Sequence, residues 1–167
     1  GGTDYDIDQG VRFAARLPND SGTLPPRRAD VINLSLGGPD FTPAAAAGLQ
    51  QARAAGVAIV AAAGNQASCQ PFYPASYPGV LSVSAVGITK ARASYSNVGP
   101  SIKVAAPGGD FSTNLNGNSG AGVLSTVATN LEGSVQPGYA FYMGTSMATA
   151  HMSGVVALMR SANPVLT

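Results

Sequence analysis

Two short apolar segments on either side of a helix-sized segment constrain the fold of this chain more than any other feature. Residues 31–38, VINLSLGG, and residues 56–65, GVAIVAAAGN, each have the length of a buried strand and run into a glycine-containing turn. Thr42 and Pro43 are typical of a helix start, and the alanine-rich segment after them ends at Gly56. Because a strand–helix–strand unit pairs its strands in parallel with a right-handed connection, the sequence predicts a parallel sheet.

Further segments extend this pattern in both directions. An apolar face within residues 6–18 predicts a helix, and apolar segments at 80–87 and 101–109 predict a third and a fourth strand. Two β segments are expected at 123–127 and 139–144, around turns at Gly133 and at Pro137 and Gly138, after a loop rich in Gly, Asn and Ser. The sequence therefore predicts one α/β domain with a mostly parallel twisted sheet flanked by helices.

Composition excludes several functional classes. The 167 residues are 45% hydrophobic and only 10% charged, which is typical of a globular chain with a real core. A net charge of +1 argues against nucleic acid and against a polybasic membrane anchor. No apolar run approaches the length of a membrane span. We therefore expect neither nucleic acid nor a membrane as a partner.

Three segments are expected at one edge of the sheet, where open α/β sheets bind ligands. Residues 35–38 follow one strand, residues 62–65 follow the next, and Ser146 begins a final helix that reaches Arg160. We assign the N-cap to Thr145 and expect a helix buried on all sides, since residues 146–159 are mainly apolar. A hydroxyl at a helix start lies beside unpaired N–H groups, a setting that suits a nucleophile.

Each of these features also has a plain structural interpretation. Serine is ordinary at the first turn of a helix, and Asn65 after Gly64 suits a turn with left-handed backbone. The small residues of the two loops suit close packing equally well. The residues by themselves leave an active site and simple packing both open.

Three motifs, in one order along the chain, resemble those of the subtilisin-like serine proteases, or subtilases. Residues 144–154, GTSMATAHMSG, resemble the serine motif of that family, and residues 61–65, AAAGN, resemble its oxyanion-asparagine motif. VINLSLGG resembles the strand that lines the substrate cleft. The resemblance covers nearly the whole chain, with one departure at Ala150, where the family usually has proline.

The resemblance implies a serine endopeptidase and a role for each motif. Ser146 would be the nucleophile that forms an acyl-enzyme, and the side-chain amide of Asn65 would donate to the oxyanion. A polypeptide substrate in extended conformation would pair as an added strand. The residues implied to contact this substrate are Ser35, Leu36, Gly37, Ala62, Ala63, Gly64 and Phe72. The ring of Phe72, at the base of the pocket, would favour mid-sized apolar side chains.

The catalytic base is not evident in the sequence. His151 is the only histidine and follows Ser146 by five positions, which on a helix turns it roughly 140° away, so we interpret it as structural. The family order is Asp, His and then Ser, and the first two motifs are missing. The resemblance thus implies that residues 1–167 are the C-terminal portion of one peptidase domain, incomplete at the N-terminus and inactive without that missing partner segment.

The resemblance also implies a secreted, extracellular enzyme with structural calcium. The backbone carbonyls of Ala75, Tyr77 and Val80 are the implied calcium ligands. Cys69, the single cysteine, would form a disulfide with the missing segment, although the sequence alone allows a free thiol equally well.

Two other functions compete with the protease hypothesis. One is a non-catalytic peptide-binding module, or pseudoprotease, that keeps the cleft without the base. The other is a nucleotide-binding α/β domain, which is disfavoured because no GxGxxG segment opens a helix after a strand.

Overall fold

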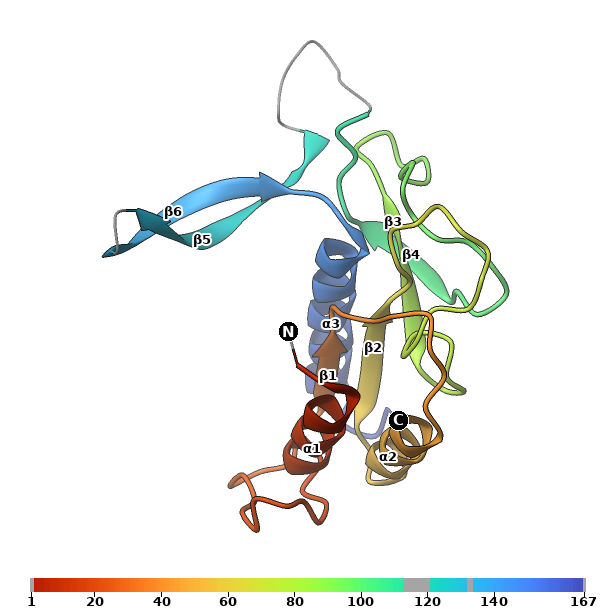
Figure 1. The fold of residues 1–167 in the computed structure, drawn as a ribbon, viewed down its shortest axis with the longest axis vertical. Coiled ribbons are helices and arrows are strands. Elements are labelled where there is room, and N and C mark those ends of the chain that lie inside the picture. The colour runs from red at the N-terminus through yellow and green to blue at the C-terminus, as the bar shows by residue number, and fades with distance from the viewer. Residues whose placement is uncertain (1, 113–120, 132–133, 167) are drawn as a thin grey trace.

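The structure is a computed structural model that describes residues 2–112, 121–131 and 134–166 (Figure 1). Its helices and strands, in chain order, are α1 (Asp4–Ala14), β1 (Val31–Leu34), α2 (Pro43–Ala54), β2 (Ala58–Ala62), β3 (Leu81–Val86), β4 (Val104–Pro107), β5 (Val123–Leu131), β6 (Ser134–Tyr142) and α3 (Thr145–Ala162). Within these ranges, no helix combines the length and the apolar character needed to cross a membrane.

The predicted parallel sheet is confirmed. Strands β1 to β4 lie side by side in chain order, and every neighbouring pair is parallel. Ile32 of β1 pairs with Ile59 of β2, and Val83 of β3 pairs with Val104 of β4. Helix α2 connects β1 to β2, as the strand–helix–strand pattern predicts. The carboxyl ends of the four strands therefore meet at one edge.

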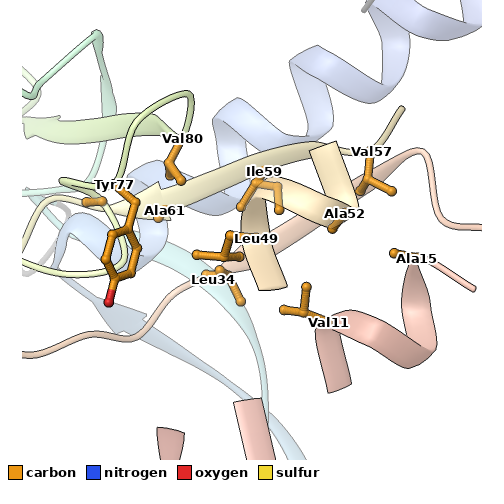
Figure 2. Packing of buried hydrophobic residues seen from close by; sticks show 11 residues of the cluster. Val11, Ala15, Leu34, Leu49, Ala52, Val57, Ile59, Ala61, Tyr77 and Val80 are labelled. Carbon is orange, nitrogen blue, oxygen red and sulfur yellow. The ribbon is translucent and has the colours of Figure 1, made fainter. Parts of the chain in front are cut away.

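Helices cover both faces of this sheet. Helix α3 contacts all four strands, whereas α1 packs against α2 and α2 against β2 (Figure 1). Side chains alternate along β2, so Ile59 and Ala61 join the cluster of α1 and α2, and Val60 joins the cluster of α3. Figure 2 shows the first cluster, in which Leu49 of α2 lies next to Ile59, and to which Val11 of α1 also belongs.

Helix α1 is shorter than its apolar pattern predicts. Thr3 and Asp6 form a reciprocal capping box at its start. At its other end Arg16 takes a left-handed conformation, with φ of 57°. The N–H of Arg16 donates to the carbonyl of Phe13 and the N–H of Leu17 to that of Arg12, the pairing of a Schellman motif. This motif ends the helix before Pro18 can do so.

Two expectations about α3 are wrong. Gly144, and not Thr145, is the N-cap residue, and the Thr145 hydroxyl donates to Asn65 of another segment. Ala148 and Thr149 are buried against the sheet, but Leu158 is 72% exposed and Met159 50%. In the described residues the sheet covers only one side of α3, so its apolar composition does not translate into burial on all sides.

Strands β5 and β6 form an antiparallel hairpin that projects away from the rest of the chain (Figure 1). The turn predicted at Pro137 and Gly138 is wrong, since both lie within β6 and pair with Ala128 and Val127. Proline is tolerated there because a two-stranded hairpin has edges at which no N–H partner is required. The predicted turn at Gly133, and most of the preceding Gly/Asn/Ser loop, lie outside the described residues.

Candidate active site

Ser146 lies in the first turn of α3 and is tied to the end of β1. Its hydroxyl donates to the carbonyl of Ser35 at 3.3 Å. In return, the hydroxyl of Ser35 donates to the carbonyl of Ser146 at 2.9 Å. Segments more than one hundred residues apart in the sequence are thus joined at the carboxyl edge of the sheet.

Asn65 is oriented by Thr145. Its Oδ1 accepts hydrogen bonds from the Thr145 N–H at 2.9 Å and from the Thr145 hydroxyl at 2.8 Å. The same hydroxyl oxygen accepts from the N–H of Gly64 at 3.2 Å. Because a backbone N–H can only donate, the atom facing Thr145 must be the oxygen. The amide Nδ2 of Asn65 is consequently turned away from Thr145.

The amide Nδ2 of Asn65 and the N–H of Ser146 border the same space beside Gly144. A Cβ atom added to Gly144 would lie 3.5 Å from Asn65 Nδ2 and 3.7 Å from Ser146 N. The sulfur of Met147 would lie 3.6 Å from that atom. Gly144 has φ of 153°, and its N–H donates to the Gly108 carbonyl at 2.9 Å. Two donors, one from Asn65 and one from the backbone of Ser146, therefore border one space beside Gly144.

Phe72 lies between the two loops predicted to contact substrate. A Cβ atom added to Gly37 would lie 2.5 Å from Phe72 Cε1, and one added to Gly64 would lie 3.0 Å from Phe72 Cγ. Gly38 and Tyr73 exchange two backbone hydrogen bonds, of 2.8 and 2.7 Å, which hold Phe72 in this position. The structure thus brings Phe72, Gly37 and Gly64 together.

The other predicted contact residues differ in exposure. Leu36 is 39% exposed, whereas Ala62 and Ala63 are buried. The N–H of Ala63 donates to the carbonyl of Val83, and its carbonyl accepts from the side chain of Asn97. Of Ala62, Ala63 and Gly64, Gly64 is therefore the residue whose missing side chain leaves room beside Phe72.

Sequence reasoning missed Asn97, which anchors the loop that carries Asn65. Asn97 is 3% exposed, and its Oδ1 accepts from the N–H groups of Gln66 and Ser68 at 2.9 and 3.1 Å. Its Nδ2 donates to the Ala63 carbonyl at 2.9 Å. A single asparagine in a turn-rich segment gives no local signal of such a role.

Tyr95 and Asp110 support the turn behind Gly144. Burial raises the pKa of Tyr95 to about 12, and its hydroxyl lies 2.9 Å from the Gly108 carbonyl and 2.6 Å from that of Gly109. Burial also acts to raise the pKa of Asp110, but hydrogen bonds from Ser112 and Ser94 outweigh it and hold that pKa below the ordinary carboxyl value. The carboxylate of Asp110 is therefore the favoured form.

His151 and the predicted calcium ligands lie apart from this cluster. The Nδ1 atom of His151 is 2.9 Å from the Met147 carbonyl, one turn back on the same helix, and the side chain is exposed. Ala75, Tyr77 and Val80 are buried, and the Tyr77 carbonyl accepts from the N–H of Val80 at 3.2 Å. Nowhere in the described ranges do three His, Cys, Asp or Glu side chains meet as metal ligands would.

Comparison with known proteins identifies the family of this chain. The Peptidase_S8 profile, described as the subtilase family, matches residues 1–167. The chain belongs to the subtilase family.

Several members of that family are similar to this chain in particular. Subtilisin DY of Bacillus licheniformis is 39% identical over 142 residues, which are 83% of this chain and 45% of that protein. Subtilisin NAT of Bacillus subtilis subsp. natto is 37% identical over 83% of this chain and 32% of that protein. A protease structure from Pseudoalteromonas arctica superposes with a TM-score of 0.89 at 37% identity, covering 100% of this chain and 49% of that one. The chain thus spans about a third to a half of the length of these relatives.

Proposed function

We propose that this chain is the C-terminal portion of the catalytic domain of a secreted serine endopeptidase, with Ser146 as the nucleophile. One observation carries the proposal: Asn65 Nδ2 and the Ser146 N–H border one space beside Gly144, the residue that precedes Ser146. Two fixed donors beside a nucleophile are the arrangement that stabilises an oxyanion. A serine that merely began a helix would need no such neighbour.

In the proposed reaction, Ser146 Oγ forms a bond to the carbonyl carbon of the cleaved peptide. The carbonyl electron pair moves to the oxygen, which accepts hydrogen bonds from Asn65 and from the Ser146 N–H. The hydroxyl proton passes to a base and then to the leaving amine, so the C–N bond breaks and an acyl-enzyme remains. Water hydrolyses this ester by the same steps.

The base of this reaction is proposed to lie upstream of residue 1. His151 is the single histidine of the sequence, and its ring bonds to the carbonyl of Met147 rather than to Ser146. We therefore assign the triad aspartate and histidine to an upstream segment of the same domain. Cys69 is exposed, which is compatible with a disulfide to that segment.

The substrate is proposed to be a polypeptide in extended conformation. Ser35, Leu36 and Gly37 follow the end of β1, and Leu36 and Gly37 are exposed. Exposed backbone at a sheet edge can pair with an added strand. Phe72 forms the base of the pocket for the residue before the cleaved bond, with Gly64 and the buried Ala62 and Ala63 on the opposite wall.

Calcium is proposed only as a structural ion. Calcium takes six to eight oxygen ligands, usually including carboxylates. The segment of Ala75, Tyr77 and Val80 offers carbonyls, one of which already accepts the Val80 N–H. Ala75, Tyr77 and Val80 would supply backbone carbonyl oxygens to this ion, which has no part in the proposed chemistry.

The second candidate is a peptide-binding module that keeps the cleft without catalysis. It is favoured by one observation, that no described residue stands beside Ser146 as a base. A sulfonyl fluoride probe separates the two functions when it is applied to the full-length protein that carries this chain. Stoichiometric labelling of the peptide that contains Ser146, absent in Ser146→Ala, supports the protease. If the folded wild-type protein resists labelling, the peptide-binding module is the better description.

A further inference from the structure

Three polar side chains join the end of β1 to the helix that carries Ser146. Strand β1 and helix α3 are in contact (Figure 1). Asn33 and Ser35 are two positions apart at the end of the strand, and Val31 of the same alternation packs against the α3 cluster, so all three face α3. Ser153 follows Ser146 by seven positions, about two helical turns, which returns it to the same side of α3.

These side chains form a continuous series of hydrogen bonds that ends at Ser146. The hydroxyl of Ser153 lies 2.9 Å from Asn33 Oδ1. Asn33 Nδ2 lies 2.9 Å from Ser35 Oγ, and Ser35 Oγ lies 2.9 Å from the Ser146 carbonyl. The series therefore leaves α3 at Ser153, crosses to β1 and returns to the first turn of the same helix.

The Ser146 carbonyl fixes the direction of every bond in this series. A carbonyl can only accept, so Ser35 gives its one hydroxyl proton to Ser146. Ser35 must then accept from Asn33, which places Nδ2 towards Ser35 and Oδ1 towards Ser153. Ser153 faces an acceptor and is the donor. Loss of the Asn33 amide would consequently free the Ser35 hydroxyl to turn away from Ser146.

The position of Ser146 depends on Ser35. Gly144 is the N-cap residue of α3 and has no side chain with which to cap the first turn. The Ser35 hydroxyl donates to the Ser146 carbonyl, and the Ser146 hydroxyl donates to the Ser35 carbonyl. A shift of Ser35 would therefore move the proposed nucleophile and the proposed substrate segment together.

We propose that Asn33 and Ser153 are positioning residues for the reaction at Ser146. Neither touches the reacting atoms. Ser153 orients the amide of Asn33, Asn33 orients the hydroxyl of Ser35, and that hydroxyl holds the first turn of α3 in register with the end of β1. This inference rests on the proposed function, since it concerns the rate at which Ser146 reacts.

The test is a double-mutant cycle in the full-length protein that carries this chain. A sulfonyl fluoride titrates reactive Ser146, and kcat for a peptide nitroanilide is expressed per titrated serine, so unfolded protein does not count. We expect Asn33→Ala to lower kcat about fivefold, the equivalent of one hydrogen bond, and to leave KM within about twofold. Ser35→Ala should lose as much, and the double variant should be no slower than Ser35→Ala, because Asn33 acts through Ser35. A residue that only stabilised the fold would not produce this non-additivity.

Variants of Ser153 test the far end of the series. Ser153→Ala should lower kcat about twofold, since Asn33 keeps its donor but loses its orientation, whereas Ser153→Thr keeps the hydroxyl and should retain kcat. Ser161→Ala is the matched control, because Ser161 is an exposed serine of the same helix and should leave kcat unchanged.

The outcomes separate this inference from the proposed function. The inference alone is overturned if wild type is labelled at Ser146 but Asn33→Ala has the wild-type kcat, or if the losses in Asn33→Ala and Ser35→Ala multiply in the double variant. If folded wild-type protein is not labelled at Ser146, the proposed function is rejected and the inference with it.

Discussion

The side-chain oxygen of Asn65 accepts two hydrogen bonds from Thr145, one from its N–H and one from its hydroxyl. The residues are 80 positions apart in the sequence. Thr145 is fully buried, whereas Asn65 is exposed, so the pair links the interior to the surface beside Ser146. The pair fixes which face of the Asn65 amide is presented beside Ser146.

Thr145→Val should weaken catalysis by releasing this orientation. The variant keeps the shape of the side chain but loses the hydroxyl, so Asn65 keeps only the backbone donor. We expect kcat to fall about fivefold, the equivalent of one hydrogen bond, with KM nearly unchanged because the oxyanion forms only during the reaction. Thr145→Ser keeps the hydroxyl and should retain most of kcat. Equal kcat values in the valine and serine variants would rule out the positioning role.

Gly144→Ala should block the proposed oxyanion position. The added Cβ would lie 3.5 Å from Asn65 Nδ2 and 3.7 Å from Ser146 N, where the substrate oxygen is proposed to sit. We expect a loss in kcat of about 100-fold or more, comparable with the removal of an oxyanion donor in a subtilisin. Gly10→Ala is the control, since an added Cβ there meets nothing within 4 Å and the helix should tolerate it. Near wild-type turnover in Gly144→Ala would place the oxyanion elsewhere.

The parallel sheet could be predicted because its signal is local. Each strand from β1 to β4 is a short apolar run ended by small residues, and the helix between β1 and β2 begins with Thr42 and Pro43. The extent of the hairpin could not be predicted, since Pro137 and Gly138 are turn residues by local rules and only their pairing with β5 keeps them extended. Exposure of Leu158 likewise depends on which side of α3 the sheet covers.

The candidate site could likewise be predicted from the sequence only in part. Ser146 and Asn65 belong to recognisable motifs, and the structure places them together. The local sequence predicts Thr145 as a helix cap, whereas in the structure its hydroxyl donates to Asn65. Asn97 contributes through four contacts to loop residues distant in sequence. Long-range hydrogen bonds of this kind leave no trace in the spacing of residues.

Gly37→Ala should destabilise the fold at the substrate segment. The new Cβ would lie 2.4 Å from the Tyr73 carbonyl and 2.5 Å from the Phe72 ring, so backbone must move. We expect the free energy of unfolding to fall by about 1–3 kcal/mol in urea titrations. The neighbouring Gly38→Ala is the matched control, because its Cβ meets nothing within 4 Å and the change should stay within about 0.5 kcal/mol. The same loss in both variants would contradict the close approach of Phe72.

Phe72→Ala should enlarge the pocket for the residue before the cleaved bond. The ring stands between Gly37 and Gly64, so its removal opens space at the base. In the full-length enzyme, kcat/KM for phenylalanine at that position should rise relative to leucine by about tenfold. Phe13→Ala, on α1, makes the same deletion elsewhere and should leave the ratio unchanged. A ratio that does not move in Phe72→Ala would show that another residue limits the pocket.

Asp110 should make stability depend on acid pH. Its pKa lies below the ordinary value of 3.8 in the folded state, so the carboxylate contributes stability at pH values above 3.8 and loses it as pH falls through the lower folded pKa. Asp110→Asn should therefore reduce the free energy of unfolding by about 2 kcal/mol at pH 7, because hydrogen bonds to a charged group are replaced by weaker ones. The difference between wild type and variant should shrink progressively below about pH 4 in urea titrations. Asp30→Asn, an exposed carboxyl, should differ from wild type by no more than about 0.5 kcal/mol at either pH. A difference for Asp110→Asn that stays constant from pH 7 to pH 3 would show that its ionisation does not stabilise the fold.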